Sequence, residues 1–373
     1  MSKSFTPGLK VLKEYIIQKN RILPLKGKVH VDKEEFVDSN KIVASTFIPG
    51  NIKMINIANK LNIEPSYISK CMLVKVGDNV HANQKIAESK GLFGFFKSEI
   101  LSPVEGEITQ ISEITGQIVI SEKPEPIEID AYITGRVKDI FKNEGVSIES
   151  TGTYVQGILG IGGEKKGELK IVSNSHGPIN ISDIKLDYKN CILLVDSFLT
   201  YDIYKRCEEI GVLGIITGGF DYKSLSKILG YSLGVAITGT EPGLTLIVTE
   251  GFGNMEMSKS TYDILAANAG KSISINGSTQ IRAGVLRPEI FIYNQKESIK
   301  KIVFDEDKLV LSIGSKVRII REPYFGELGT ITQLPFELQE MDSGTICRVA
   351  KVQFKDKTEK IVPRTNLEVI LSD

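Results

Sequence analysis

A change of hydrophobic rhythm after Cys191 constrains the fold of this chain more than any other feature. Cys191–Asp196 is an apolar run of strand length, and the apolar residues that follow recur at helical spacing until Gly211. Two further rounds of strand and helix come next, the last ending near Gly270. Because such alternation is typical of parallel strands joined by crossover helices, residues 185–290 are expected to form a small parallel α/β domain.

Period-two alternation dominates the remainder of the chain. Between residues 21 and 175, short alternating segments are separated by Gly, Asp and Asn, which is typical of short strands and tight turns. A helical insert near residues 55–71 interrupts them, and residues 308–373 are again rich in strand-forming residues. The expected fold class is therefore multidomain β plus α/β, and a chain of 373 residues is long enough for several cores.

The first twenty residues form a basic leader. This segment contains one acidic residue, Glu14, and four basic ones: Lys3, Lys10, Lys13 and Lys19. Residues 9–17 have the spacing of a short helix. We expect residues 1–20 to be a solvated and partly ordered segment, and the alternative is a basic arm that contacts an acidic partner.

Composition excludes some classes of function. The chain has 46 basic and 46 acidic residues, so only local patches could attract nucleic acid. It has no apolar run of membrane-spanning length and no signal peptide, which predicts a cytoplasmic protein. The cysteines and histidines lack metal-ligand spacing, so neither a metal site nor a cofactor is expected. The four cysteines read as small core residues of a reducing compartment: Cys71, Cys191, Cys207 and Cys347.

Two stretches of the N-terminal half echo each other. Val37 and Ala44 have the same spacing as Val80 and Ala87, and Ser102-Pro-Val-Glu-Gly106 follows the second stretch. With Val76-Gly-Asp-Asn-Val80, these motifs resemble the barrel-sandwich hybrid fold of biotinyl and lipoyl carrier domains. That fold also occurs in membrane-fusion adaptors and in Rnf-type electron-transfer subunits. The resemblance covers about residues 21–121, and it implies a barrel-sandwich hybrid in the region 21–175 with its helical insert and a β extension.

The carrier lysine of that family has no counterpart here. Counting back from Pro103, its position falls on Phe95, so the resemblance does not imply covalent cofactor attachment. The expected hairpin instead carries an apolar run, formed by Leu92, Phe93, Phe95 and Phe96. These side chains either fold back onto the protein or form an exposed tip that docks into a protein partner.

The C-terminal segment carries a second family motif. The spacing of Gly314, Gly326 and Gly329, together with the basic alternating strand between them, resembles the KOW motif of NusG-type elongation factors and some ribosomal proteins. The resemblance implies an SH3-like barrel with an RNA, ribonucleoprotein or protein partner. Cations beside an aromatic turn suit contact with phosphates and bases, and the alternative is a solvated strand face. The candidate contact residues are Lys316, Arg318, Arg321, Tyr324 and Phe325.

The central domain offers a third candidate region. Open α/β sheets bind ligands at the carboxyl ends of their parallel strands. Candidate ligand-binding residues lie where these ends are expected: Asp196, Gly218, Gly219, Glu250, Gly251 and Gly253. The sequence has no dinucleotide fingerprint, Walker lysine or nucleophile elbow, so the alternative is that these glycines only form tight turns.

These observations favour a non-catalytic adaptor or scaffold that binds a macromolecular partner. In this interpretation the KOW barrel and the aromatic hairpin make the contacts, and no catalytic residue is assigned. One alternative is a small-molecule or nucleotide-binding protein, or an enzyme, that uses the central domain. Another is an accessory subunit of an electron-transfer or membrane complex.

Overall fold

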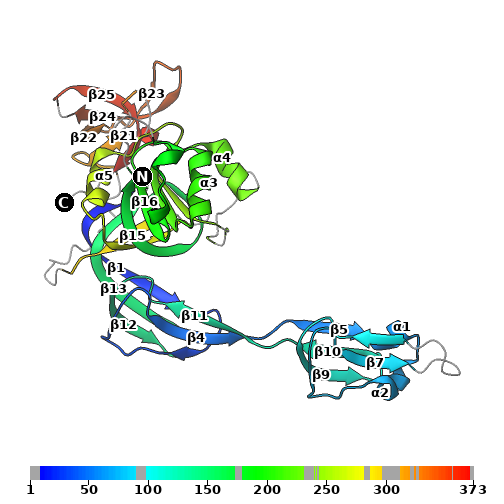
Figure 1. Cartoon of the computed structure of the whole chain (residues 1–373). Helices are drawn as coiled ribbons and strands as arrows, with labels where there is room; N and C mark the ends of the chain where they lie inside the picture. Colours follow the sequence, from blue (N-terminus) through cyan, green and yellow to red (C-terminus); the bar gives the residue numbers. More distant parts are fainter. Residues whose placement is uncertain are drawn as a thin grey trace.

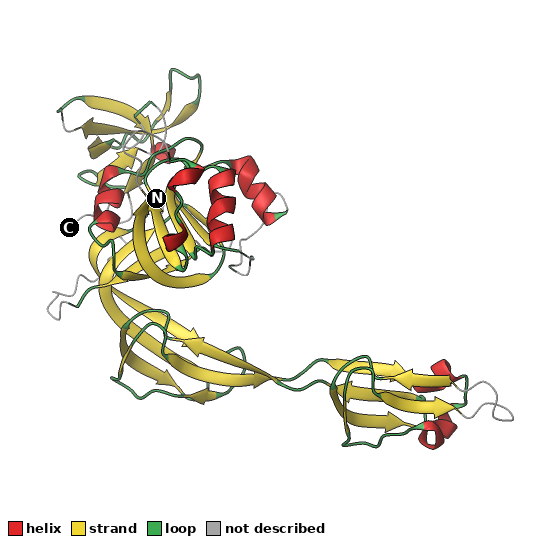
Figure 2. Ribbon diagram, viewed as in Figure 1, coloured by secondary structure: helices red, strands yellow, loops and turns green. Residues whose placement is uncertain are grey.

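The computed structural model describes residues 9–89, 98–172, 179–230, 239, 241, 243–280, 286–295, 311–319, 323–324, 327–354 and 356–369. The molecule is elongated (Figure 1): a head that contains the longer helices is connected by an arm of long strands to a small module at the far end. Among the residues that the structure describes, α-helices lie in the head and in that far module (Figure 2).

One eleven-stranded sheet runs through the head and into the arm, in the order β14-β18-β17-β16-β15-β19-β20-β13-β12-β3, with β1 also paired to β13. Only β15 to β18 are parallel neighbours. The strands of this sheet are β1 (Val11–Ile22), β3 (Phe36–Val37), β12 (Gly135–Phe141), β13 (Gly145–Gln156), β14 (Leu159–Ile161), β15 (Glu164–Val172), β16 (Cys191–Val195), β17 (Gly214–Phe220), β18 (Thr245–Phe252), β19 (Ser272–Asn276) and β20 (Glu289–Tyr293). The expected parallel strands are therefore present, but antiparallel strands from the N-terminal half continue their sheet.

Helices cover both faces of the parallel strands. Helices α3 (Tyr201–Ile210) and α4 (Tyr222–Leu229) pack on one face, and α5 (Lys259–Ala266) packs on the other. Alternate residues of β16 enter opposite cores, as Leu193 and Ile192 show. This two-sided burial explains why these strands are apolar throughout.

Most of the described part of the expected leader belongs to a strand, β1. β1 pairs with β13 from Val11↔Val155 to Ile22↔Gly145, and Leu12 and Ile17 are buried. The helix expected for residues 9–17 is therefore wrong. Pairing with β13, a strand more than a hundred residues further along the chain, supplies the burial that decides between strand and helix, and no local sequence pattern indicates it.

The arm contains two β modules of the same design, one nested within the other. The proximal module comprises residues 28–48 and 125–141, and the distal module comprises residues 52–121. In the proximal module Val37 of β3 pairs with Gly135, and in the distal module Val80 of β6 pairs with Gly106 in the same register. The remaining elements of the arm are β2 (Lys28–Val29), β4 (Ile42–Ile48), β5 (Ile52–Asn56), α1 (Ile57–Leu61), α2 (Ile68–Cys71), β6 (Asn79–Val80), β7 (Lys85–Ser89), β8 (Ser98–Leu101), β9 (Gly106–Ser112), β10 (Gln117–Ser121) and β11 (Glu125–Asp130).

Backbone hydrogen bonds confirm the equivalence of the two modules. The bond from Ala131 N to Lys41 O in the proximal module corresponds to the bond from Ser102 N to Gln84 O in the distal one. The reciprocal bonds of Val137 with residues 34 and 35 likewise correspond to those of Ile108 with residues 77 and 78. The echo between the two sequence stretches is thus a structural repeat. Residues 131–137, expected as an outer layer of one module, belong to a second copy.

The distal module is inserted into one pair of strands of the proximal module. In the distal module, β7 and β8 form a hairpin, and in the proximal module β4 and β11 are its counterparts. The distal module is inserted at the tip of this proximal hairpin, through Pro49–Asn51 and Glu122–Pro124, so only two chain segments connect it to the rest of the molecule (Figure 1).

The C-terminal segment forms a separate six-stranded sheet in the order β23-β24-β22-β21-β26, with β25 also paired to β24. It has its own core around Val317, Ile331, Val352 and Leu367. Its strands are β21 (Lys316–Ile319), β22 (Leu328–Gln333), β23 (Leu338–Glu340), β24 (Ile346–Phe354), β25 (Glu359–Pro363) and β26 (Leu367–Val369). Among the helices that the structure describes, none is long and apolar enough to cross a membrane.

Candidate functional site

The carboxyl ends of the parallel strands are covered by the protein's own main chain. The segment after Gly253 crosses the ends of β17 and β16, and Met257 N donates a 2.8 Å hydrogen bond to Asp196 O. A Cβ atom on Gly218 would collide with the backbone of residues 255–257, and one on Gly219 would collide with Gly253. These glycines therefore allow close backbone packing, which is the structural alternative to a ligand site.

The other candidate residues at these strand ends differ in burial and in backbone conformation. Glu250 is only 6% exposed and is bonded to Arg318 and to the Ser258 backbone. Gly251 and Gly253 have φ angles of 149° and 109°, which side chains rarely adopt. Asp196 is exposed, and partial desolvation raises its pKa, with further contributions from the carboxylates of Glu256 and Asp263.

Arg318 joins the C-terminal sheet to the central sheet. Its guanidinium donates to Glu250 (2.9 Å) and to Glu368 (3.0 and 2.6 Å), and only 5% of the residue is exposed. Glu368 also accepts a hydrogen bond from the backbone of Leu9. The expectation that Arg318 contacts a partner from the surface is therefore wrong, because the strand face on which alternation places it is covered by the end of β18.

The structure describes two of the other predicted partner-binding residues. Lys316 is exposed, and half-buried Tyr324 packs against Phe354 with ring centroids 5.5 Å apart. The rest lie outside the described residues: Arg321, Phe325, Leu92, Phe93, Phe95 and Phe96.

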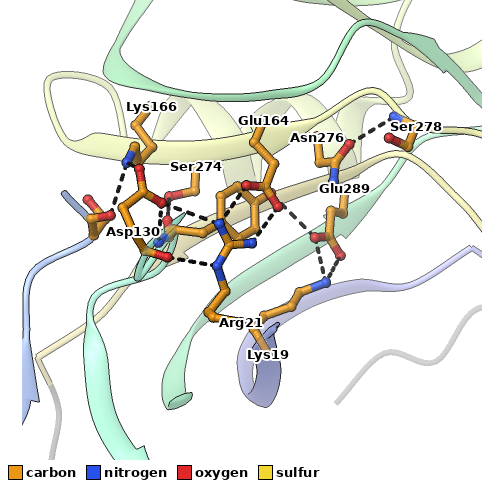
Figure 3. Close-up of polar contacts among 11 residues, drawn as sticks. Lys19, Arg21, Asp130, Glu164, Lys166, Ser274, Asn276, Ser278 and Glu289 are labelled. Carbon is orange, nitrogen blue, oxygen red and sulfur yellow. Dashed lines mark hydrogen bonds and ion pairs between the residues drawn. The ribbon is translucent and has the colours of Figure 1, made fainter. Parts of the chain in front are cut away.

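The densest polar cluster lies where the arm meets the head (Figure 3). Arg21 of β1 forms a bidentate ion pair with Glu164 of β15, with N–O distances of 2.7 and 2.8 Å, and its Nε donates to Asp130 O at 2.8 Å. The Asp130 carboxylate also pairs with Lys166, whose ammonium donates to Ser39 O at 3.0 Å. These contacts connect β1 and both halves of the proximal module to the sheet of the head.

Glu289 is the buried centre of this cluster. It is 6% exposed and accepts hydrogen bonds from Lys19 (2.6 Å), Tyr154 (3.0 Å) and Tyr132 (3.3 Å). Burial raises the pKa of both tyrosine hydroxyls above the ordinary value, and the negative charge of Glu289 adds to the shift. Three donor groups, from β1, the proximal module and β13, therefore converge on the Glu289 carboxylate of β20.

Tyr132 is held in an unusual backbone conformation beside Glu289. Its φ angle is 62°, and the hydrogen bond from Ile133 N to Ala131 O (2.7 Å) closes a three-residue turn around it. Asp130 Oδ1 accepts from Tyr132 N at 3.0 Å, and Ser274 Oγ donates to Tyr132 O at 2.5 Å. The head therefore stabilises a strained turn of the proximal module, which couples the orientation of the arm to the sheet of the head.

Alkaline pH should weaken this junction. Because the folded state raises the pKa of Tyr154, the unfolded chain loses this proton near pH 10 while the folded protein retains it. The protonated Tyr154 hydroxyl therefore contributes its full share to the free energy of unfolding below pH 10. Above pH 10 this stabilisation decreases by about 1.4 kcal/mol per pH unit until the folded protein also loses the proton. Chemical denaturation between pH 8 and 11 should show a shallower alkaline loss for Tyr154→Phe than for the wild type. Parallel pH curves for the two proteins would contradict this expectation.

The distal module has an open groove of about 700 Å³ between residues 72–76 and 110–114, lined by apolar side chains and by polar ones such as Lys75, Gln110 and Glu113. Leu73, Val76 and Ile114 on its walls are 52%, 58% and 91% exposed. At the corresponding positions the proximal module has His30, Lys33 and, in the equivalent turn, Asn143, all of them exposed. The same backbone design thus accepts polar residues here, so the apolar side chains of the distal copy are not required by the fold.

Sequence reasoning identified neither the junction cluster nor the groove. The cluster unites acids and bases from strands far apart in the chain, whereas the groove becomes visible only when the two modules are aligned residue by residue. In the described part of the chain no group of His, Cys, Asp and Glu is arranged to hold a metal ion. Comparison with protein-family models and with curated proteins gave no match for this chain.

Proposed function

We propose that this protein is a non-catalytic adaptor that holds one macromolecular partner at the distal groove and another at its C-terminal sheet. The comparison of the two nested modules carries the proposal. Their cores are equivalent, with Val43 and Val137 in one corresponding to Ile86 and Ile108 in the other, all fully buried. At these groove positions the distal copy exposes three large apolar side chains where the proximal copy has polar ones, and exposed apolar side chains gathered in a groove are typical of an interaction site.

The shape of the molecule supports a role with two contacts. The distal module lies at the end of the arm, away from the head and the C-terminal sheet (Figure 1). The ion pairs of Arg21 with Glu164 and of Asp130 with Lys166 connect the proximal part of the arm to the head. At the ends of β16 and β17, where the alternative of a ligand site would place its residues, main chain packs against Asp196, Gly218 and Gly219. The KOW and barrel-sandwich resemblances agree with an adaptor and remain proposals.

The groove can be tested by giving the distal module the residues of the proximal one. We expect Leu73→His, Val76→Lys and Ile114→Asn together to abolish binding of the distal partner and to change the free energy of unfolding by less than about 1 kcal/mol, because exposed positions contribute little to stability. Affinity purification of wild-type and variant protein from the source cells, quantified by mass spectrometry, gives the comparison. Denaturant unfolding of both proteins checks the fold.

A matched control places the same chemical change elsewhere on the distal module. Ile52→Lys and Met54→Asn alter residues of β5 that are 69% and 67% exposed but lie outside the groove. These substitutions should leave partner recovery unchanged. Equal recovery of all partners by the groove variant and the wild type would refute the distal contact.

A further inference from the structure

In the part of the chain that the structure describes, two strands connect the proximal and distal modules (Figure 1). Ile48 pairs with Glu125 where the proximal module ends, and Ile52 pairs with Ser121 where the distal module begins. Each strand has three residues between these pairs, so a single antiparallel register continues through the linker. The linker is thus a two-stranded ribbon, and an isolated pair of strands is only marginally stable in water.

Two prolines interrupt the hydrogen bonds of this ribbon. Pro49 and Pro124 lie opposite each other in the continuous register. Because proline has no backbone N–H, neither residue can donate a hydrogen bond to the other strand. The structure shows one main-chain hydrogen bond between the two linker segments, from Glu122 N to Asn51 O at 2.9 Å. The ribbon therefore resists bending less at this point than do the fully paired strands on either side.

The side-chain contacts of the linker are exposed. Lys123 pairs with Glu105 of the distal module at 2.6 Å, although the two side chains are 72% and 49% exposed. The Asn51 amide donates to the Glu122 carboxylate at 3.1 Å, also at the surface. Exposed pairs of this kind contribute little to stability, because water and salt screen them. These contacts therefore do not fix the angle between the two modules.

The two modules also have separate hydrophobic cores. The core of the distal module lies entirely within residues 55–120. The core of the proximal module, in contrast, includes Ile148 of β13 and Phe291 of β20, so it is continuous with the sheet of the head. Among the hydrogen bonds and ion pairs of the described residues, none joins residues 52–121 to a residue outside 49–124. Parts of a chain that lack a large apolar interface are expected to move relative to each other.

We propose that residues 49–51 and 122–124 are a hinge, about which the distal module swings as a rigid body while the proximal module stays fixed to the head. Hinges are typically a few residues at the ends of elements that absorb the change in backbone angles between two rigid parts. The swing varies the distance between the distal module and the C-terminal sheet. The inference goes beyond the adaptor proposal and does not rest on it, because the motion requires no partner.

Distances between spin labels on the full chain test the hinge. Labels at Lys138→Cys and Thr109→Cys report on the proximal and distal modules, and a second pair, Lys138→Cys and Glu209→Cys, spans the proximal module and the head. All three positions are exposed. We expect double electron–electron resonance to give a broad distribution of distances for the first pair and a narrow one for the second. The half-buried native cysteines are replaced by serine in every sample: Cys71 and Cys347.

A variant of the linker locates the motion. Pro49→Thr combined with Pro124→Thr restores both N–H donors, so it should narrow the first distribution toward the width of the second. Pro126→Thr is the matched control, because this exposed proline of β11 lies in the proximal module, and it should leave the first distribution unchanged. The second label pair, measured in the double variant, shows that the rest of the molecule remains folded.

Two outcomes would overturn the hinge. One is equal width of the two distributions in the wild type, which would mean that the distal module is held as firmly as the proximal one. The other is a first distribution that stays as broad in the double variant as in the wild type, because the motion would then not arise at the prolines. Neither measurement involves a partner, so the hinge and the adaptor proposal fail separately.

Discussion

Replacement of Arg318 by alanine should destabilise the protein by about 3–5 kcal/mol. The guanidinium is the described counter-charge of both Glu250 and Glu368, and these carboxylates are only 6% exposed. Its removal leaves two negative charges in a site that water hardly reaches, and an uncompensated buried charge is among the most destabilising single changes. Because one carboxylate belongs to β18 and the other to β26, the loss should loosen the C-terminal sheet from the head.

Equilibrium unfolding and limited proteolysis measure the two parts of this expectation. The control is Lys316→Ala, an exposed basic residue two positions away on the same strand, which should cost no more than about 0.5 kcal/mol. We also expect earlier proteolytic release of the C-terminal sheet from the Arg318→Ala variant. If both alanine variants have the same free energy of unfolding as the wild type, the ion pairs of Arg318 do not hold the two sheets together.

Local periodicity was sufficient to predict the parallel strands β16 to β18 and the helices that follow them. Apolar residues at helical spacing located α3, whose buried side chains include Ile203, Cys207 and Ile210, and Gly211 ends it in the left-handed conformation. The strands β16 to β18 were equally visible, because strands buried on both faces are continuous apolar runs. The spacing of Val37 to Ala44 and Val80 to Ala87 likewise pointed to a repeat that the register confirms.

Contacts between distant strands could not be predicted in the same way. Alternation correctly placed Arg318 opposite Val317, but the sequence contains no sign that another sheet covers that face. β1 has the composition of a basic leader, although pairing with β13 makes it a strand. Glu289 lies more than a hundred residues from each of its partners Lys19, Tyr132 and Tyr154. In each case the deciding energy is burial by a distant segment.

The second large effect is expected at Glu289, the centre of the junction between arm and head. Glu289→Leu should destabilise the protein by about 3–5 kcal/mol, because it leaves the ammonium of Lys19 without its carboxylate and two buried tyrosine hydroxyls without an acceptor. Glu164→Gln is the matched control: its carboxylate pairs with Arg21 but is 36% exposed, so its loss should cost no more than about 1 kcal/mol. Thermal and denaturant unfolding of both variants provide the measurement.

A compensated variant then distinguishes lost polar partners from lost packing. Adding Tyr132→Phe, Tyr154→Phe and Lys19→Met to Glu289→Leu removes the unsatisfied donors, and an apolar cluster of similar volume can replace a buried polar one at little cost. We therefore expect the quadruple variant to recover most of the stability lost by Glu289→Leu alone. If the quadruple variant is instead less stable than Glu289→Leu, the packing of these side chains, and not their hydrogen bonds, stabilises the junction between arm and head.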